Sequence, residues 1–168
     1  MDPRLIVVRG PSGAGKSSVV EGMRAAYGRG VAWIEQDHVR RTMFQEDREP
    51  DGANIAAIGL LAELALERGF HAVVEGILPT DRYGGMLCEL VERHPAYVYF
   101  LDISFDETVR RHGTRGKASA FGADAMREWY RGHDPLGVPG EVIIDESSTL
   151  AETVRRVLSD TGLAAGTG

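Results

Sequence analysis

Five short apolar runs recur along the chain, and the segments between them repeat apolar residues at helical spacing. The runs are residues 5–8, 31–34, 72–74, 98–101 and 142–144. Continuous apolar runs are typical of strands buried on both faces, and their alternation with helices indicates a parallel sheet. We therefore expect an α/β fold, a doubly wound five-stranded parallel sheet with helices on both faces.

The first three segments between the runs, and the segment after the last run, each predict one helix with a single apolar face. The faces comprise Val19, Val20, Met23 and Tyr27; Ile55, Ile58, Leu61, Leu64 and Ala65; Met86, Leu87, Leu90 and Val91; and Leu150, Val154, Val157 and Leu158. Ser147-Ser148 is a candidate cap for the last helix. The length fits one domain over residues 1–160, and the small, polar residues 161–168 predict a tail without fixed structure.

Residues 10–17 read Gly-Pro-Ser-Gly-Ala-Gly-Lys-Ser and form a complete phosphate-binding loop, or Walker A motif. The motif follows an apolar run and precedes a helical pattern, which is the context that it needs. Its glycines let backbone N–H groups turn toward phosphate oxygens, whereas a chance glycine-rich turn is the alternative. The residues expected to bind nucleotide are Gly10, Ser12, Gly13, Ala14, Gly15, Lys16, Ser17 and Ser18.

Two of these residues are expected to do more than cradle the phosphates. Lys16 is one of only two lysines among 19 basic residues, so its place in the motif is not incidental. We expect it to act in catalysis by reaching the β- and γ-phosphates of ATP. Ser17 is expected to bind Mg²⁺.

Composition limits the partners and the location of the protein. A net charge of −6 argues against nucleic acid as the main partner. The single cysteine, Cys88, excludes an internal disulfide and is interpreted as a small core residue. No apolar run approaches the roughly 20 residues of a membrane span, and the first strand follows Met1 too closely for a signal peptide, so we expect a cytoplasmic protein without a membrane partner.

Polar residues follow the second run, at the end of a strand where ligands bind in open α/β sheets. Asp37 is expected to accept a proton from a substrate hydroxyl, or to orient that hydroxyl. Arg40 and Arg41, one helical turn further on, are candidate substrate contacts. The alternatives are a helix cap for Asp37 and a solvated face for the two arginines.

Glu75 follows the third apolar run. A carboxylate at this place in a phosphate-loop enzyme contacts Mg²⁺ through water or binds substrate, and we expect Glu75 in one or both roles. A purely structural strand end is the alternative.

Basic residues concentrate after the fourth run, in an otherwise acidic chain. Arg110, Arg111, Arg115 and Lys117 lie within eight positions, beside glycines that suit a mobile lid near residues 110–122. Arg111 and Arg115 are expected to be catalytic by stabilising the transferred phosphoryl group. Tyr130, which follows the lid, is a candidate substrate contact; a solvated basic face and ordinary packing are the alternatives.

These segments, in this order, resemble the small-molecule branch of P-loop kinases, such as gluconate, shikimate and adenylylsulfate kinases, chloramphenicol phosphotransferase and zeta-toxin-type kinases. Residues 37–40, Asp-His-Val-Arg, are similar to the Asp-Asn-Val-Arg segment of adenylylsulfate kinases. Residues 101–111 with Arg115 resemble the helix-to-lid arginine pattern of the wider group, and residues 142–145 resemble its last strand and base-flanking turn. The resemblance covers residues 4–159.

The sequence therefore predicts a kinase that uses ATP and Mg²⁺ to phosphorylate a hydroxyl of a small polar metabolite or antibiotic. Two other functions are compatible with the same motifs. One is nucleotide hydrolysis coupled to another event, and the other is a non-catalytic module that senses ATP.

Overall fold

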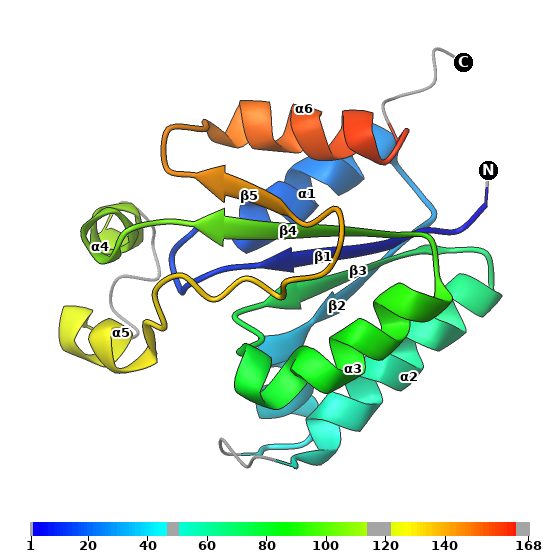
Figure 1. Cartoon of the computed structure of the whole chain (residues 1–168), viewed down its shortest axis with the longest axis horizontal. Coiled ribbons are helices and arrows are strands. Elements are labelled where there is room, and N and C mark those ends of the chain that lie inside the picture. Colours follow the sequence, from blue (N-terminus) through cyan, green and yellow to red (C-terminus); the bar gives the residue numbers. More distant parts are fainter. Residues whose placement is uncertain (1, 47–50, 114–121, 164–168) are drawn as a thin grey trace.

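The computed structural model, which describes residues 2–46, 51–113 and 122–163, contains a five-stranded sheet in which every neighbouring pair is parallel. The strand order is β2-β3-β1-β4-β5 (Figure 1). The strands are β1 (Leu5–Arg9), β2 (Val31–Glu35), β3 (His71–Gly76), β4 (Ala96–Asp102) and β5 (Val142–Asp145). All five coincide with the apolar runs of the sequence, so the predicted parallel sheet is confirmed.

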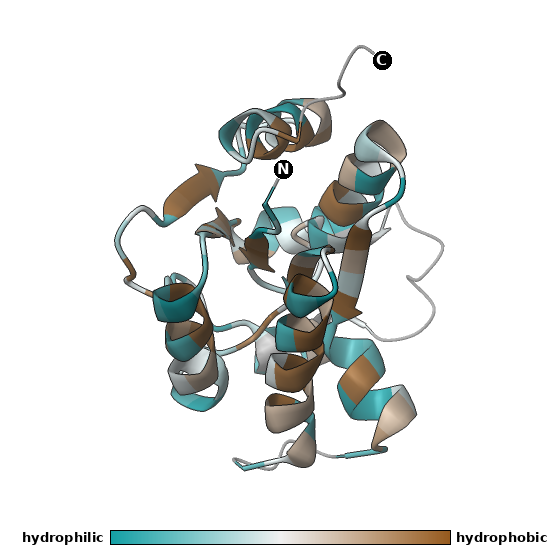
Figure 2. Cartoon of the chain, turned by 90° about the vertical axis from the view of Figure 1, so that its right-hand side faces the viewer, coloured by the Kyte–Doolittle hydropathy of each residue, from teal (hydrophilic) through white to brown (hydrophobic). Residues whose placement is uncertain are grey.

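Helices cover both faces of the sheet, as Figure 1 shows for α1 and α6 on one side and α2 and α3 on the other. Their bounds are α1 (Lys16–Tyr27), η1 (a π-helix, His38–Met43), α2 (Ala53–Glu67), α3 (Thr80–Arg93), α4 (Phe105–Gly113), α5 (Ala123–Trp129) and α6 (Leu150–Asp160). The main helices alternate apolar and polar positions (Figure 2). The fold is therefore doubly wound, as predicted.

The central strand β1 divides the core between the two faces. Leu5 and Val7 pack with α2 and α3, whereas Ile6 and Val8 pack with α1 and α6. This alternation follows from the two-residue period of a strand, and all four side chains are fully buried.

The strand order determines where chemistry can occur. All strands are parallel, so their carboxyl ends share one edge of the sheet, on the side of α4 and α5 in Figure 1. Because β1 lies between β3 and β4, the loop that follows β1 stands at the middle of this edge. The residues that follow β3 and β4 flank it directly, and those that follow β2 lie one strand beyond.

Side chains cap the starts of α6 and α2, and the cap of α6 differs from the sequence prediction. Thr149, not Ser147-Ser148, caps α6, and it forms a capping box with Glu152. Ser147 instead bonds to the Asp145 carboxylate, to which both its backbone N–H and its hydroxyl donate. At the start of α2, the Glu46 carboxylate accepts hydrogen bonds from two backbone N–H groups, those of residues 53 and 54.

The first residues of the expected tail are packed against the rest of the protein. Leu163 is fully buried, and its backbone N–H donates to the Leu158 carbonyl, so residues 161–163 pack against the sheet with α6. Residues 164–168 lie outside the described part of the chain. Within the described residues, no helix is long and apolar enough to cross a membrane. Cys88 is a free thiol and is half-buried.

Candidate active site

The loop that follows β1 wraps back on itself and leads directly into α1. Gly13 and Gly15 have φ angles of 81° and 100°, which residues with a side chain rarely adopt. Gly15 immediately precedes the helix. A Cβ on Gly13 would also lie 2.8 Å from the Thr108 carbonyl oxygen of α4. Glycine is therefore required at both positions by backbone angle, and at Gly13 also by close packing.

Lys16 and Ser17 begin α1 and face the end of β3. Lys16 is 7% exposed, and its ammonium donates to the Pro11 carbonyl at 2.8 Å, so the side chain curls back over the loop. The Ser17 hydroxyl donates to Glu75 Oε2 at 3.3 Å. The structure therefore brings the loop and the third strand's carboxylate together, as the sequence predicted.

Glu75 is 3% exposed, and its carboxylate also accepts from the indole N–H of Trp33 at 3.3 Å. Burial raises the pKa of Glu75, while the nearby Lys16 charge and the two hydrogen bonds work in the opposite direction. A buried carboxylate that is held by only long hydrogen bonds is suited to a cation. Together with the Ser17 hydroxyl it offers the oxygen ligands that Mg²⁺ prefers.

The raised pKa has a consequence for stability. The ionised carboxylate opposes folding at neutral pH, and this penalty disappears as the pH falls through the raised pKa toward the ordinary glutamate range. We expect Glu75→Gln to raise the melting temperature at neutral pH while it lowers turnover with Mg·ATP. The gain in melting temperature should shrink on acidification.

Thermal melts of both proteins across the acid-to-neutral range measure this effect, with the exposed Glu89→Gln as the control. A lower melting temperature for Glu75→Gln at neutral pH would mean that the carboxylate is a structural support.

Asp37, Arg40 and Arg41 lie together at the end of β2, where η1 begins. The Asp37 carboxylate is 3.4 Å from Arg40 Nη2 and 3.3 Å from Arg41 Nε. Asp37 makes no side-chain cap to the helix, which removes the capping alternative. Glu35, the last residue of β2, is in register with Glu75 of β3. Asp37 and the two arginines, which come just after Glu35, therefore lie next to the end of β3.

Arg111 lies on the opposite side of the loop. Its Nη1 donates to the Ala14 carbonyl at 3.0 Å, and its Nε donates to Glu107 at 2.7 Å. Hydrogen bonds from Arg110 and Arg111 lower the pKa of Glu107 to about 2, so this anchor stays ionised. Arg111 therefore contacts the phosphate-binding loop itself.

A cavity of about 250 Å³ adjoins Arg111. It is enclosed by the loop and α1, the ends of β4 and β5, and the turn that leads into α6. Its lining includes Ala14, Val19, Leu101, Ile144, Ser148 and Thr149. The cavity is apolar at its base and polar along the turn, as a site for a flat polar ring requires.

Two predicted site residues are still to be considered, Arg115 and Tyr130. Arg115 and most of the predicted lid lie outside the described residues. Tyr130 follows α5, and its hydroxyl donates to the Ile103 carbonyl at 2.9 Å while its ring packs edge-on against Phe105. In this structure Tyr130 packs against the loop after β4, on the opposite side of β1 from Asp37.

Sequence reasoning missed Arg9, the last residue of β1. Its side chain is fully buried, and it donates twice to the Leu78 carbonyl and also to Asp134 at 3.1 Å. Asp134 in turn accepts from the backbone N–H and the hydroxyl of Thr80, at the start of α3. Arg9, the residue that immediately precedes the phosphate-binding loop, thus joins three segments.

We expect Arg9→Met to destabilise the protein by about 3–5 kcal/mol, because removing one partner of a buried ion pair strands the other. Burial lowers the pKa of Arg9, but Asp134 and Glu141 oppose this, and arginine remains charged. Urea unfolding measures the loss, with the exposed Arg29→Met as control. A loss below about 1 kcal/mol, the range of surface pairs, would contradict the role of Arg9.

The loop geometry, the lysine and serine at the start of α1 and the parallel sheet define a P-loop nucleotide-binding protein with a kinase-like fold. The chain belongs to the AAA domain family, which matches residues 5–135.

Solved structures agree over nearly the whole chain. A gluconokinase from Sinorhizobium meliloti 1021 is 30% identical, with a TM-score of 0.64 over 96% of this chain and 91% of its own. APS kinase from Mycobacterium tuberculosis, in complex with AMPPNP and APS, is 16% identical with a TM-score of 0.71, covering 96% and 98%. The Deinococcus radiodurans tunicamycin resistance protein is 15% identical with a TM-score of 0.67, covering 99% of each chain.

The similarity to P-loop small-molecule kinases that the sequence indicated is therefore confirmed. Among curated protein sequences, none matches this chain.

Proposed function

We propose that the protein is an ATP-dependent kinase that transfers the γ-phosphate to a hydroxyl of a small polar molecule. The observation that carries the proposal is the meeting of Lys16, Ser17 and the buried Glu75 at one edge of the sheet, with Asp37 at the end of the neighbouring strand. Phosphoryl transfer depends on positioning and charge stabilisation, and this edge supplies both.

Lys16 and the backbone N–H groups of the loop neutralise the phosphate charge. On binding, Lys16 exchanges the Pro11 carbonyl for phosphate oxygens, which are stronger partners for an ammonium. Ser17 and Glu75 would hold Mg²⁺, which neutralises phosphate charge when it is bound. The burial of Lys16 and Glu75 strengthens these interactions because little water competes.

Asp37 handles the acceptor. The acceptor oxygen forms a bond to the γ-phosphorus, the bond from that phosphorus to the β–γ bridging oxygen breaks, and the hydroxyl proton passes to the Asp37 carboxylate. Arg40 is 8% exposed, and its Nε has no hydrogen-bond partner among the described residues. This unsatisfied donor favours an acceptor that carries a carboxylate or another anionic group.

The 250 Å³ cavity is assigned to the nucleotide base, because it opens beside Ala14 and is too small to hold both substrates. Arg111, which lines it, is placed to contact the phosphates when it releases the Ala14 carbonyl.

We expect Arg111→Ala to lower kcat on the order of 10²-fold, as removal of a charge-stabilising donor does. Steady-state kinetics measures the loss. Arg110→Ala is the matched control, because Arg110 shares the Glu107 partner but is 67% exposed. Equal effects of the two substitutions would reduce Arg111 to part of a surface ion pair.

The function is tested by incubating the protein with Mg·ATP and a panel of sugar acids, other hydroxylated metabolites and antibiotics, and detecting phosphorylated product by mass. Sugar acids are tested first, because a gluconokinase is the relative at 30% identity. A phosphorylated product supports the proposal. ADP without product would indicate a nucleotide hydrolase, and tight ATP binding without turnover would indicate a sensing module.

A further inference from the structure

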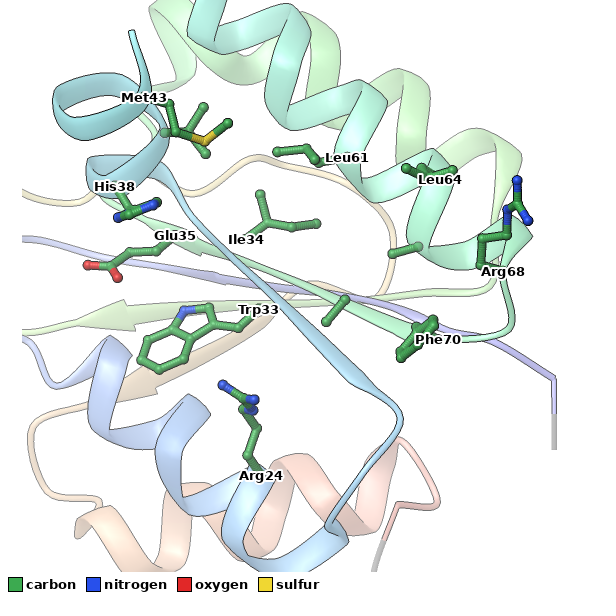
Figure 3. Close-up of a pocket in the computed structure, with 13 residues that line it drawn as sticks. Arg24, Trp33, Ile34, Glu35, His38, Met43, Leu61, Leu64, Arg68 and Phe70 are labelled. Atoms are coloured by element: carbon green, nitrogen blue, oxygen red, sulfur yellow. The ribbon is translucent and has the colours of Figure 1, made fainter. Parts of the chain in front are cut away.

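A larger cavity, of about 570 Å³, lies along the outer edge of β2, and none of its lining residues belongs to the phosphate-binding loop. Figure 3 shows Trp33 and Ile34 on the strand, Arg24 of α1 on one side and Leu61 and Leu64 of α2 on the other. We call this surface the β2 groove. The proposed kinase reaction assigns none of these side chains to a substrate, and only the indole N–H of Trp33 reaches the site, where it donates to Glu75.

The backbone of β2 is available in the groove. β2 pairs with β3 alone in the described sheet, and the His71 N–H donates to the Gly30 carbonyl. Because partners alternate along a parallel strand, the N–H and C=O groups of Val31, Trp33 and Glu35 face outward. The strand carries neither the lysine nor the proline with which natural edge strands avoid pairing.

Large apolar side chains surround this edge and are exposed to solvent. Met43 is 55% exposed, Leu64 49% and Phe70 44%, and all three line the groove; Leu60, 70% exposed, is on the same helix as Leu64. A contiguous exposed apolar patch beside an open strand marks a surface that binds another protein.

Charges in the groove are separated along the strand. Arg68 follows α2 and comes shortly before His71, which pairs with Val31, so it lies near the start of β2. Glu35 lies at the other end of β2 (Figure 3). Arg24 lies 5.9 Å from the Trp33 ring, one helical turn before the end of α1. In the part of the chain that the structure describes, none of these three charged groups has an ion-pair partner.

We propose that the β2 groove is the interface of a homodimer, in which two copies meet with antiparallel β2 edges about a two-fold axis beside Trp33. Trp33 and Glu35 alternate onto the α1 face of the sheet, so the axis places Arg24 of each copy opposite the partner's Glu35. The basic end of one groove meets the acidic end of the other. This self-complementarity favours a second copy over an unrelated partner, which would need to supply a matching pair of charges.

The first test is the molar mass in solution, by light scattering after size-exclusion chromatography and by sedimentation across the micromolar range. A mass of twice the 168-residue chain is expected. A monomer throughout this range would overturn the proposal and leave the groove for another occupant, such as an added peptide strand.

The second test locates the interface. Leu64→Glu should give a monomer, because it introduces a charge into an apolar contact. Ile143→Glu is the matched control, since Ile143 is 44% exposed but lies on β5, the opposite edge of the sheet. A dimer that survives Leu64→Glu, or that only Ile143→Glu disrupts, would place the interface elsewhere.

The third test uses the charges. Arg24→Glu and Glu35→Arg should each weaken dimerisation on the order of ten-fold, because the two-fold axis repeats each pair. The double variant should restore affinity, because it exchanges the charges across the axis. Arg155→Glu, an exposed change of equal charge on α6, should have no effect. Additive losses in the double variant would contradict the antiparallel arrangement.

Discussion

Lys16→Ala should reduce kcat/KM with Mg·ATP on the order of 10³-fold, with ATP affinity falling as well. The ammonium is the one side-chain cation that the loop itself contributes to the phosphates, and in a buried site its charge is worth far more than on a surface. Steady-state kinetics with the acceptor identified from the panel measures the loss, and calorimetry measures ATP binding.

The fold of this variant should remain intact. Without nucleotide, Lys16 makes a hydrogen bond to the Pro11 carbonyl within its own loop, which alanine removes without disturbing the sheet. A melting temperature close to that of the wild type is therefore expected. Lys16→Arg is the second variant, because it keeps the charge but replaces the compact ammonium with a planar fork. If Lys16→Ala keeps wild-type turnover, the loop does not act on the transferred phosphate.

The strands and the phosphate-binding loop could be predicted from the sequence because each is encoded locally. Strands buried on both faces are built around continuous apolar runs, as β1 is over residues 5–8 and β3 over residues 72–74, and the loop needs glycines at fixed spacing. The meeting of Ser17 with Glu75 was also predictable, since parallel strands bring their carboxyl ends to one edge.

Residues whose roles depend on distant partners could not be found in this way. In the sequence, Arg9 is indistinguishable from an ordinary polar residue at the end of a strand. Its partners Leu78 and Asp134 are 69 and 125 positions away. Trp33 reads as a strand residue, and only the β2–β3 register reveals its bond to Glu75. Strand order is likewise a property of tertiary contacts, and β2 could be recognised as an edge strand only after the sheet was assembled.

The start of α6 shows a different reason for a wrong prediction. Ser147, Ser148 and Thr149 all have hydroxyls that could cap a helix, so composition does not choose among them. The choice depends on Glu152, which lies three residues after Thr149 and completes a capping box with it, while Ser147 bonds to Asp145 in the preceding turn. Competition among neighbouring hydrogen bonds therefore decided the boundary.

Asp37→Asn should reduce kcat by about 10²- to 10⁴-fold, the usual contribution of a general base, while ATP affinity stays unchanged. The amide is nearly isosteric with the carboxylate but cannot take the hydroxyl proton. The Asp37 side chain of the wild type is 53% exposed, so loss of its ion pairs with Arg40 and Arg41 should cost under about 1 kcal/mol of stability. The loss of turnover should therefore not be a consequence of unfolding.

Asp81→Asn provides the matched control for this variant. Asp81 is 58% exposed and is paired with Arg131 at 3.3 Å. The same substitution there weakens a comparable surface ion pair, but away from the end of β2. Turnover of the control should equal that of the wild type. Single-turnover kinetics and ATP titration separate the steps. An equal loss of ATP binding in Asp37→Asn would move this carboxylate from the acceptor to the nucleotide site, and unchanged kcat would remove it from the reaction.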